Sequence, residues 1–175
     1  MPLLVPPPAL TLTATSSPPG TQDGLLEQQG LLGVLELQID EFRSATDMDC
    51  SVCIEVAFGA RAPQGALASA VVQIFREALA NIARHADAHR VSIDVRLDPG
   101  RLDISVVDDG RGADPLALER LHSRGVPGMR KRAQDLGGSL TIATAPAAGA
   151  RVDLSVPLRD AFERSEQPIS PRPGC

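Results

Sequence analysis

The sequence contains very few aromatic residues. Of its 175 residues, 2% are aromatic, and there is no tryptophan or tyrosine. Proteins that hold single-stranded nucleic acids commonly stack bases on aromatic side chains, so the composition argues against that function. The net charge of −5 at pH 7 also argues against a nucleic-acid surface. With 43% hydrophobic residues, a single domain can still bury a core of Leu, Val, Ile and Ala.

Cysteine and long apolar runs are also scarce. Cys50 and Cys53 have C-x-x-C spacing, but the alternation around them predicts a strand and no second pair follows, so we expect no zinc or redox site. We see no apolar run comparable to the ~20 residues of a membrane span. The opening residues 1–8 lack the basic region of a secretion signal. We therefore expect a cytoplasmic protein without a membrane span.

Composition divides the chain into three regions. Residues 1–24 are rich in Pro, Ser and Thr, and residues 160–175 combine prolines with charges. Both compositions are typical of disordered tails. Residues 25–159 form one predicted domain, in which residues 25–46 are a lead-in helix.

Hydrophobic periodicity predicts the elements of this domain. Helical spacing predicts helices over 25–45, 66–86 and 128–136. Alternation predicts five strands, of which the second and third pair as a hairpin. Because alternating strands have one wet face, the helices cover only the other, which predicts a two-layer α/β sandwich with a mixed sheet. The residues predicted to face inward are Val52, Ile54, Val56 and Phe58 in the first strand, Val91, Ile93, Val95 and Leu97 in the second, Leu102, Ile104 and Val106 in the third, Leu140 and Ile142 in the fourth, and Val152, Leu154 and Val156 in the fifth.

The most informative pattern lies in the helix over 66–86. Residues 76–85 read REALANIARH, which places Glu77, Asn81 and His85 in one stripe at i, i+4 and i+8. This stripe borders the predicted apolar face, and a carboxylate at such an edge needs a partner. A hydrated Mg²⁺ with phosphates would supply one. A Glu–Asn pair bonded to nearby backbone is the alternative.

Two segments with paired glycines follow this helix. Asp108 ends the third strand on its inward side, where it can accept a hydrogen bond from an amine such as that of adenine. Gly110 and Gly112 allow the backbone to approach a flat ligand; a plain Asp-Gly turn is the alternative. Gly125 and Gly128 flank a predicted helix start, where N–H groups attract phosphate; an ordinary loop and helix start is the alternative. In this order, the segments predict a nucleotide site with a metal.

Together, these segments resemble the ATP-binding domain shared by gyrase, Hsp90, histidine kinases and MutL, which has the Bergerat-type fold. Within that superfamily, the chain looks most like sensor histidine kinases whose partners are LuxR-type (NarL-like) response regulators. Residues 76–86 resemble the N box, residues 107–112 the G1 box, residues 125–133 the G2 box and its helix, and residues 149–158 the closing strand. The similarity covers about residues 30–158.

The resemblance implies ATP and Mg²⁺ as cofactors and a role for each site residue. Asn81 would bind Mg²⁺, and Glu77 would act in catalysis by polarising water or the phosphate-accepting group. Asp108 would bind the adenine amine, in a pocket that Gly110 and Gly112 shape.

The resemblance also assigns the phosphate side of the site. Gly125 and Gly128 would line the phosphates beneath a lid, and His85 would help to position phosphate, unless it is a packed helix-end histidine. Two residues depart from the family pattern in ways that affect lid closure. Ser123 replaces the first glycine of the lid's usual G-x-G, and Pro127 stiffens the turn.

These kinases carry a phosphate-accepting histidine on a dimerising helix. The three histidines here, His85, His89 and His122, all lie within the predicted ATP domain. The resemblance therefore implies a module that phosphorylates a histidine supplied in trans, with a histidine-bearing dimerisation partner or a LuxR-type response regulator as its partner. A non-catalytic or anti-sigma-factor-like ATP-binding regulatory protein is the alternative.

Overall fold

The computed structural model describes residues 22–113 and 125–158, and all structural statements below concern these residues. The predicted tails, apart from residues 22–24, and the lid residue Ser123 lie outside them. In chain order the elements are α1 (Gln22–Ala45), β1 (Asp49–Val56), α2 (Gly65–Asn81), the π-helical turn η1 (Ile82–Ala86), β2 (Arg90–Asp98), β3 (Arg101–Asp108), α4 (Gly125–Asp135), β4 (Ser139–Thr144) and β5 (Ala150–Pro157).

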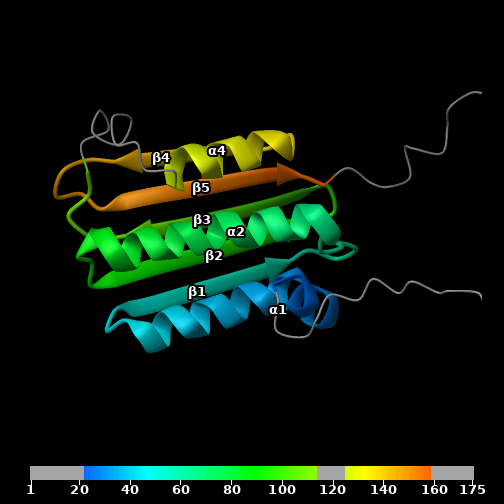
Figure 1. Ribbon diagram of the computed structural model, residues 1–175, viewed down its shortest axis with the longest axis horizontal. Coiled ribbons are helices and arrows are strands. Elements are labelled where there is room, and N and C mark those ends of the chain that lie inside the picture. The colour runs from blue at the N-terminus through cyan, green and yellow to red at the C-terminus, as the bar shows by residue number, and fades with distance from the viewer. Residues whose placement is uncertain (1–21, 114–124, 159–175) are drawn as a thin grey trace, which may run out of the picture.

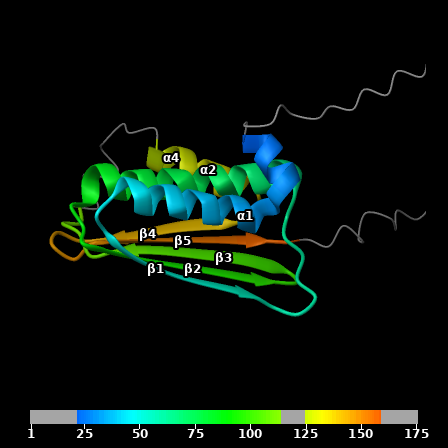
Figure 2. The ribbon, with the colours of Figure 1, turned by 90° about the horizontal axis from the view of Figure 1, so that it is seen from below.

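The five strands form one mixed sheet in the order β1-β2-β3-β5-β4 (Figure 1). β1 runs parallel to β2, and the other neighbouring pairs are antiparallel. The helices lie on one face of the sheet (Figure 2). The predicted two-layer α/β sandwich and the predicted β2–β3 hairpin are thus confirmed.

The core lies between the helices α1, α2 and α4 and the inner face of the sheet. The inward sets predicted for β2 and β3 are confirmed, since every one of those side chains is at most 3% exposed. On α2 the buried face is broad and comprises Ala68, Val71, Val72, Ile74, Phe75, Ala78 and Leu79. α2 contacts α1 and α4 on its two sides and shares one core cluster with the strands below, which explains this width.

The prediction for the first strand was wrong at its end. Val56 and Phe58 were expected to face inward, but Val56 is 52% exposed and Phe58 is fully exposed. β1 is an edge strand that ends at Val56. Gly59, with φ of 79°, then turns the chain toward α2, so Phe58 belongs to the turn and not to the sheet.

Two helix starts also differ from the predictions. α1 begins at Gln22, so residues 22–24 belong to this helix and not to a tail, and the helix is interrupted at Gly30, with φ of 70° and ψ of 177°. α4 begins at Gly125, three residues before its predicted start. Pro127 fits there because the first turn of a helix needs no donor from it.

The segment Gly65–Ala86 corrects the expectation that no apolar run of the chain is comparable in length to a membrane span. It has 22 residues and contains an 18-residue window with a mean hydropathy of 1.3, so it is long and apolar enough to cross a membrane by length and composition alone. Its apolar side chains, however, pack against the sheet: Val71, Ile74 and Phe75 are at most 1% exposed. We interpret it as the central core helix of this domain.

Candidate functional site

Asp108 occupies the position that its strand parity predicted. It is the last residue of β3 and points toward the helical layer, where its exposure is only 6%. Among the described residues it is the only charged one that is buried. Its Oδ1 accepts a hydrogen bond of 2.9 Å from the backbone N–H of Gly110. A buried carboxylate needs further donors to offset its desolvation, so this position is suited to an amine of a ligand.

The glycines after Asp108 let the loop pack against protein backbone. A side chain at Gly110 would collide with the carbonyl of Ala86, at the end of η1. Gly112, with φ of 61°, lies against the carbonyl of Ala145 in the turn between β4 and β5. The loop is therefore held closely between the end of the α2–η1 helix and that turn.

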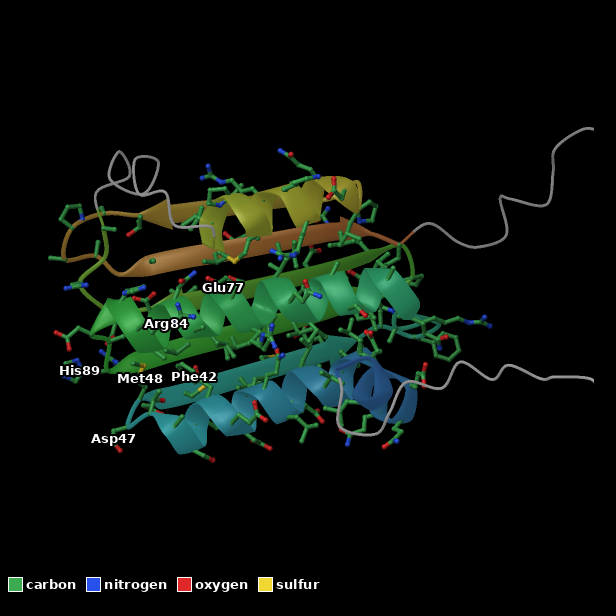
Figure 3. All side chains as sticks on the ribbon, in the orientation of Figure 1. Phe42, Asp47, Met48, Glu77, Arg84 and His89 are labelled. Carbon is green, nitrogen blue, oxygen red and sulfur yellow. The ribbon has the colours of Figure 1, made fainter. Side chains whose placement is uncertain are left out.

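Glu77 and Asn81 lie where the helical wheel placed them. Both are half-buried, at the edge of the face that α2 turns toward the core. Glu77 lies on the side of α2 that faces α4 (Figure 3). Its carboxylate contacts Gly125, the first residue of α4, at a point where a side chain would require Oε1 to move. The fold thus brings together two segments that are 48 positions apart in the sequence.

The N-terminus of α4 is the anion-attracting part of this site. Gly125 and Gly128 both lie in its first turn, where free N–H groups and the helix dipole favour negative charge. The carboxylate of Glu77 lies at this helix end in the structure. A phosphate group is also negatively charged and also needs hydrogen-bond donors.

His85 does not continue the stripe that Glu77 and Asn81 begin. It is exposed and lies in η1, a π-helical turn. The i→i+5 bonding of such a turn breaks the i, i+4, i+8 register on which the prediction depended. Its backbone carbonyl accepts a 2.7 Å hydrogen bond from Nε of Arg111.

The sequence reasoning missed Asp109. Its Oδ1 accepts hydrogen bonds of 2.8 Å from the backbone N–H groups of His89 and Arg90, and its Oδ2 accepts one of 3.2 Å from Nε of Arg90. The backbone donors at Arg90 and His89 lower the pKa of Asp109 to about 2. Successive strand residues point to opposite faces, so the parity that placed Asp108 inward could also have assigned Asp109 to a separate role.

The depressed pKa of Asp109 predicts acid sensitivity. Because its folded-state pKa lies below the unfolded value of about 3.9, Asp109 contributes stability above about pH 4 that is lost as the pH falls toward 2. We expect Asp109→Asn to be less stable than the parent at pH 7, with the difference shrinking through this window. Chemical denaturation at stepped pH measures it. Glu27→Gln, an exposed change on α1, is the control, and a pH-independent difference for Asp109→Asn would contradict the prediction.

The sequence analysis did not predict a role for two more polar residues near the site, Thr144 and Arg84. Thr144, at the end of β4, accepts a hydrogen bond from the backbone N–H of Ala113 and donates one to the carbonyl of Gly149, both of 2.9 Å. Arg84 is exposed on η1, three residues after Asn81, near the end of the helix in Figure 3. The i+3 spacing from Asn81 is a signal that could have identified it.

Few side chains of the described residues are placed to bind a metal ion. Across residues 22–113 and 125–158, no group of three or more His, Cys, Asp or Glu side chains converges as a metal site. Mg²⁺ commonly takes one or two protein ligands and completes its shell with water and substrate phosphates. The half-buried amide of Asn81, one helical turn from Glu77, fits that mode of binding.

The fold and this site define a nucleotide-binding α/β domain of the ATPase type. The chain belongs to the family of histidine kinase-, DNA gyrase B-, and HSP90-like ATPases, whose model matches residues 66–160. Domains of this family bind ATP, and the chain is a histidine kinase-type ATPase domain similar to sensor histidine kinases.

Two curated relatives come from Bacillus subtilis (strain 168). The sensor histidine kinase YxjM is 36% identical over 88 residues, which cover 50% of this chain and 21% of the relative. The sensor histidine kinase LiaS is 28% identical over 133 residues, which cover 76% of this chain and 36% of the relative. The chain therefore spans about a fifth to about a third of the length of these relatives.

Solved structures support the same fold. The histidine kinase domain of the Erythrobacter litoralis EL346 blue-light activated histidine kinase aligns with a TM-score of 0.56 and 20% identity, covering 73% of this chain and 64% of that one. A structure of the Erythrobacter litoralis EL346 kinase aligns with a TM-score of 0.58 and 20% identity, covering 80% and 47%.

Proposed function

We propose that this domain binds ATP with Mg²⁺ and transfers the γ-phosphate to a histidine supplied in trans. The acceptor would lie on a histidine-bearing dimerisation partner, and the phosphate would pass to a response regulator of the LuxR or NarL type. The observation that carries the proposal is the buried carboxylate of Asp108, beside the helix that bears Glu77 and Asn81. The compartment that we propose is the cytoplasm, where ATP is available.

Asp108 would select the base. Its buried carboxylate accepts hydrogen bonds and cannot donate one when ionised. It would therefore bind the exocyclic amine of adenine and disfavour the carbonyl that guanine presents at the corresponding position. Gly110 and Gly112 would shape this pocket by letting the loop after Asp108 pack against the carbonyls of Ala86 and Ala145.

The phosphates would lie between the two helix ends. The N–H groups at Gly125 and Gly128 would donate to them, and the guanidinium of Arg84 would add positive charge. Asn81 would hold Mg²⁺ through its amide oxygen. When bound, Mg²⁺ offsets the charge of the phosphate oxygens.

The contribution of the protein to transfer would be positioning and electrostatics, as is usual for phosphoryl transfer. Glu77 would accept a hydrogen bond, through Oε1, from the N–H of the incoming imidazole. This contact would orient the ring and place its other nitrogen toward the phosphate. Because Glu77 now contacts Gly125, its carboxylate must share the helix end with the phosphates, which keeps acceptor and donor close together.

The distinguishing experiment is incubation of this chain with γ-labelled ATP and Mg²⁺. We expect no stable label on the chain alone. His85 lies on the same helical segment as Asn81 and would have to leave the helix for in-line attack, and His89 precedes β2. Addition of a dimerisation domain with an acceptor histidine should give acid-labile phosphate on that domain. His122 lies outside the described residues, and a His122→Ala variant controls for it.

Label on any of the three histidines of the chain alone would contradict transfer in trans. ATP binding without transfer to any offered acceptor would instead favour the non-catalytic, regulatory alternative.

A further inference from the structure

We propose that Arg111 and Asp109 are positioning residues that join the base-binding loop to the metal-binding helix, so that Asn81 is held in place from the base-binding side. This inference depends on the proposed function, because it concerns how the same site is assembled. The residues involved meet at one end of the sheet, where α2 and β3 end and where β5 begins (Figure 1).

The first link is a cap on the helix that bears Asn81. The last carbonyls of a helix have no partner within it. Here two of them are bonded by a single residue: Nε of Arg111 donates to the carbonyl of His85, and the backbone N–H of Arg111 donates to the carbonyl of Ala86, both at 2.7 Å. Arg111 therefore fixes the end of η1, four to five residues after Asn81.

The second link is the carboxylate of Asp109. It accepts three hydrogen bonds from His89 and Arg90, and its own backbone N–H donates to the carbonyl of Arg90 at 3.2 Å. His89 and Arg90 follow the helix after Asp87, whose φ of 50° ends it. Residues before the helix end, His85 and Ala86, and residues after it, His89 and Arg90, are thus all bonded to the loop that follows Asp108.

The loop after Asp108 is also bonded to the turn that precedes β5. The backbone N–H groups of Ala147 and Gly149 donate to the carbonyls of Arg111 and Gly110, at 2.7 and 2.9 Å. Gly149, with φ of 69°, also lies against the carbonyl of Asp108, where a side chain would collide. Because the loop is also held by β5 and its preceding turn, it can act as a fixed support for the helix.

Loss of the Arg111 side chain should affect mainly the Mg²⁺-dependent part of nucleotide binding. Asp108 is held by β3 and by Gly110, so base recognition survives loss of the Arg111 side chain. Asn81 is the last residue of α2 and leads directly into the π-helical turn η1, whose last carbonyls are bonded by Arg111. Loss of the cap should therefore displace the metal ligand more than the base acceptor.

The test compares nucleotide affinity with Mg²⁺ and with EDTA, by calorimetry with ATP and ADP on the whole chain. For Arg111→Ala we expect the enhancement of ATP affinity by Mg²⁺ to fall about tenfold, the usual effect of losing one charged hydrogen bond. The affinity for ADP in EDTA should change by less than about twofold. Arg151→Ala, which removes an exposed arginine from the outer face of β5, is the matched control and should change neither value.

Asp109→Ala separates positioning from a direct charge effect. If Arg111 acted by its charge on the phosphates, removal of the nearby Asp109 carboxylate would raise nucleotide affinity. If both residues position the helix, Asp109→Ala lowers the Mg²⁺ enhancement, as Arg111→Ala does. A gain in affinity, an equal loss in Mg²⁺ and in EDTA, or no change for both variants would each overturn the inference. Failure of the parent chain to bind ATP in Mg²⁺ would overturn the proposed function itself, and with it this inference.

Discussion

Asn81→Ala should remove the Mg²⁺-dependent part of ATP affinity, a loss of about 10- to 150-fold, which corresponds to a charged hydrogen-bond or ligand contact of about 1.5–3 kcal/mol. The amide is half-buried at the end of α2, on the same edge as Glu77. Alanine favours a helix, so the change removes a ligand without weakening the helix. Titration of ATP in Mg²⁺ and in EDTA measures the loss, and the melting temperature verifies the fold.

Two controls make this result specific. Gln134→Ala removes an exposed amide from α4 and should bind ATP as the parent does. In EDTA, Asn81→Ala and the parent should bind ATP equally, because the adenine and the N-terminus of α4 are unchanged. If Asn81→Ala retained the full Mg²⁺ enhancement, the assignment of Asn81 as the metal ligand would be wrong.

The parts of the site that could be predicted are those set by local periodicity. The alternation of β3 placed Asp108 on the inner face because β2 and β5 cover both edges of that strand. The wheel of α2 placed Glu77 and Asn81 at the edge of the core because α2 is a regular helix up to Asn81. In both cases the residue and the core that fixes its direction belong to the same element.

The parts that could not be predicted depend on contacts between distant segments. The π-helical turn that moves His85 out of the stripe is stabilised by Arg111, 26 positions away. The roles of Asp109 and Thr144 follow from bonds with the backbone of His89 and of Ala113, 20 and 31 positions away, which only the assembled fold brings near. Alternation also fails at Phe58, because an edge strand ends where its neighbour no longer pairs with it, and residue type does not reveal that point.

Asp108→Asn should weaken the preference for ATP over GTP by roughly 1–3 kcal/mol, about 5- to 150-fold. The substitution keeps the shape of the side chain, and its amide oxygen can still accept the hydrogen bond from Gly110. Its NH₂ group, however, would meet the amine of adenine as a second donor, whereas it could donate to the carbonyl of guanine. Competition binding with ATP and GTP measures the ratio directly.

The matched control is Asp103→Asn, the same change on the same strand but on the opposite face of the sheet. Asp103 pairs with Arg101 at 2.7 Å on that outer face, so its substitution should leave the ATP to GTP ratio unchanged. A general loss of stability in Asp108→Asn would lower the affinities for both nucleotides together, and only base recognition changes their ratio. An unchanged ratio in Asp108→Asn, with the fold intact, would therefore show that this buried carboxylate supports the loop through Gly110 and does not read the base.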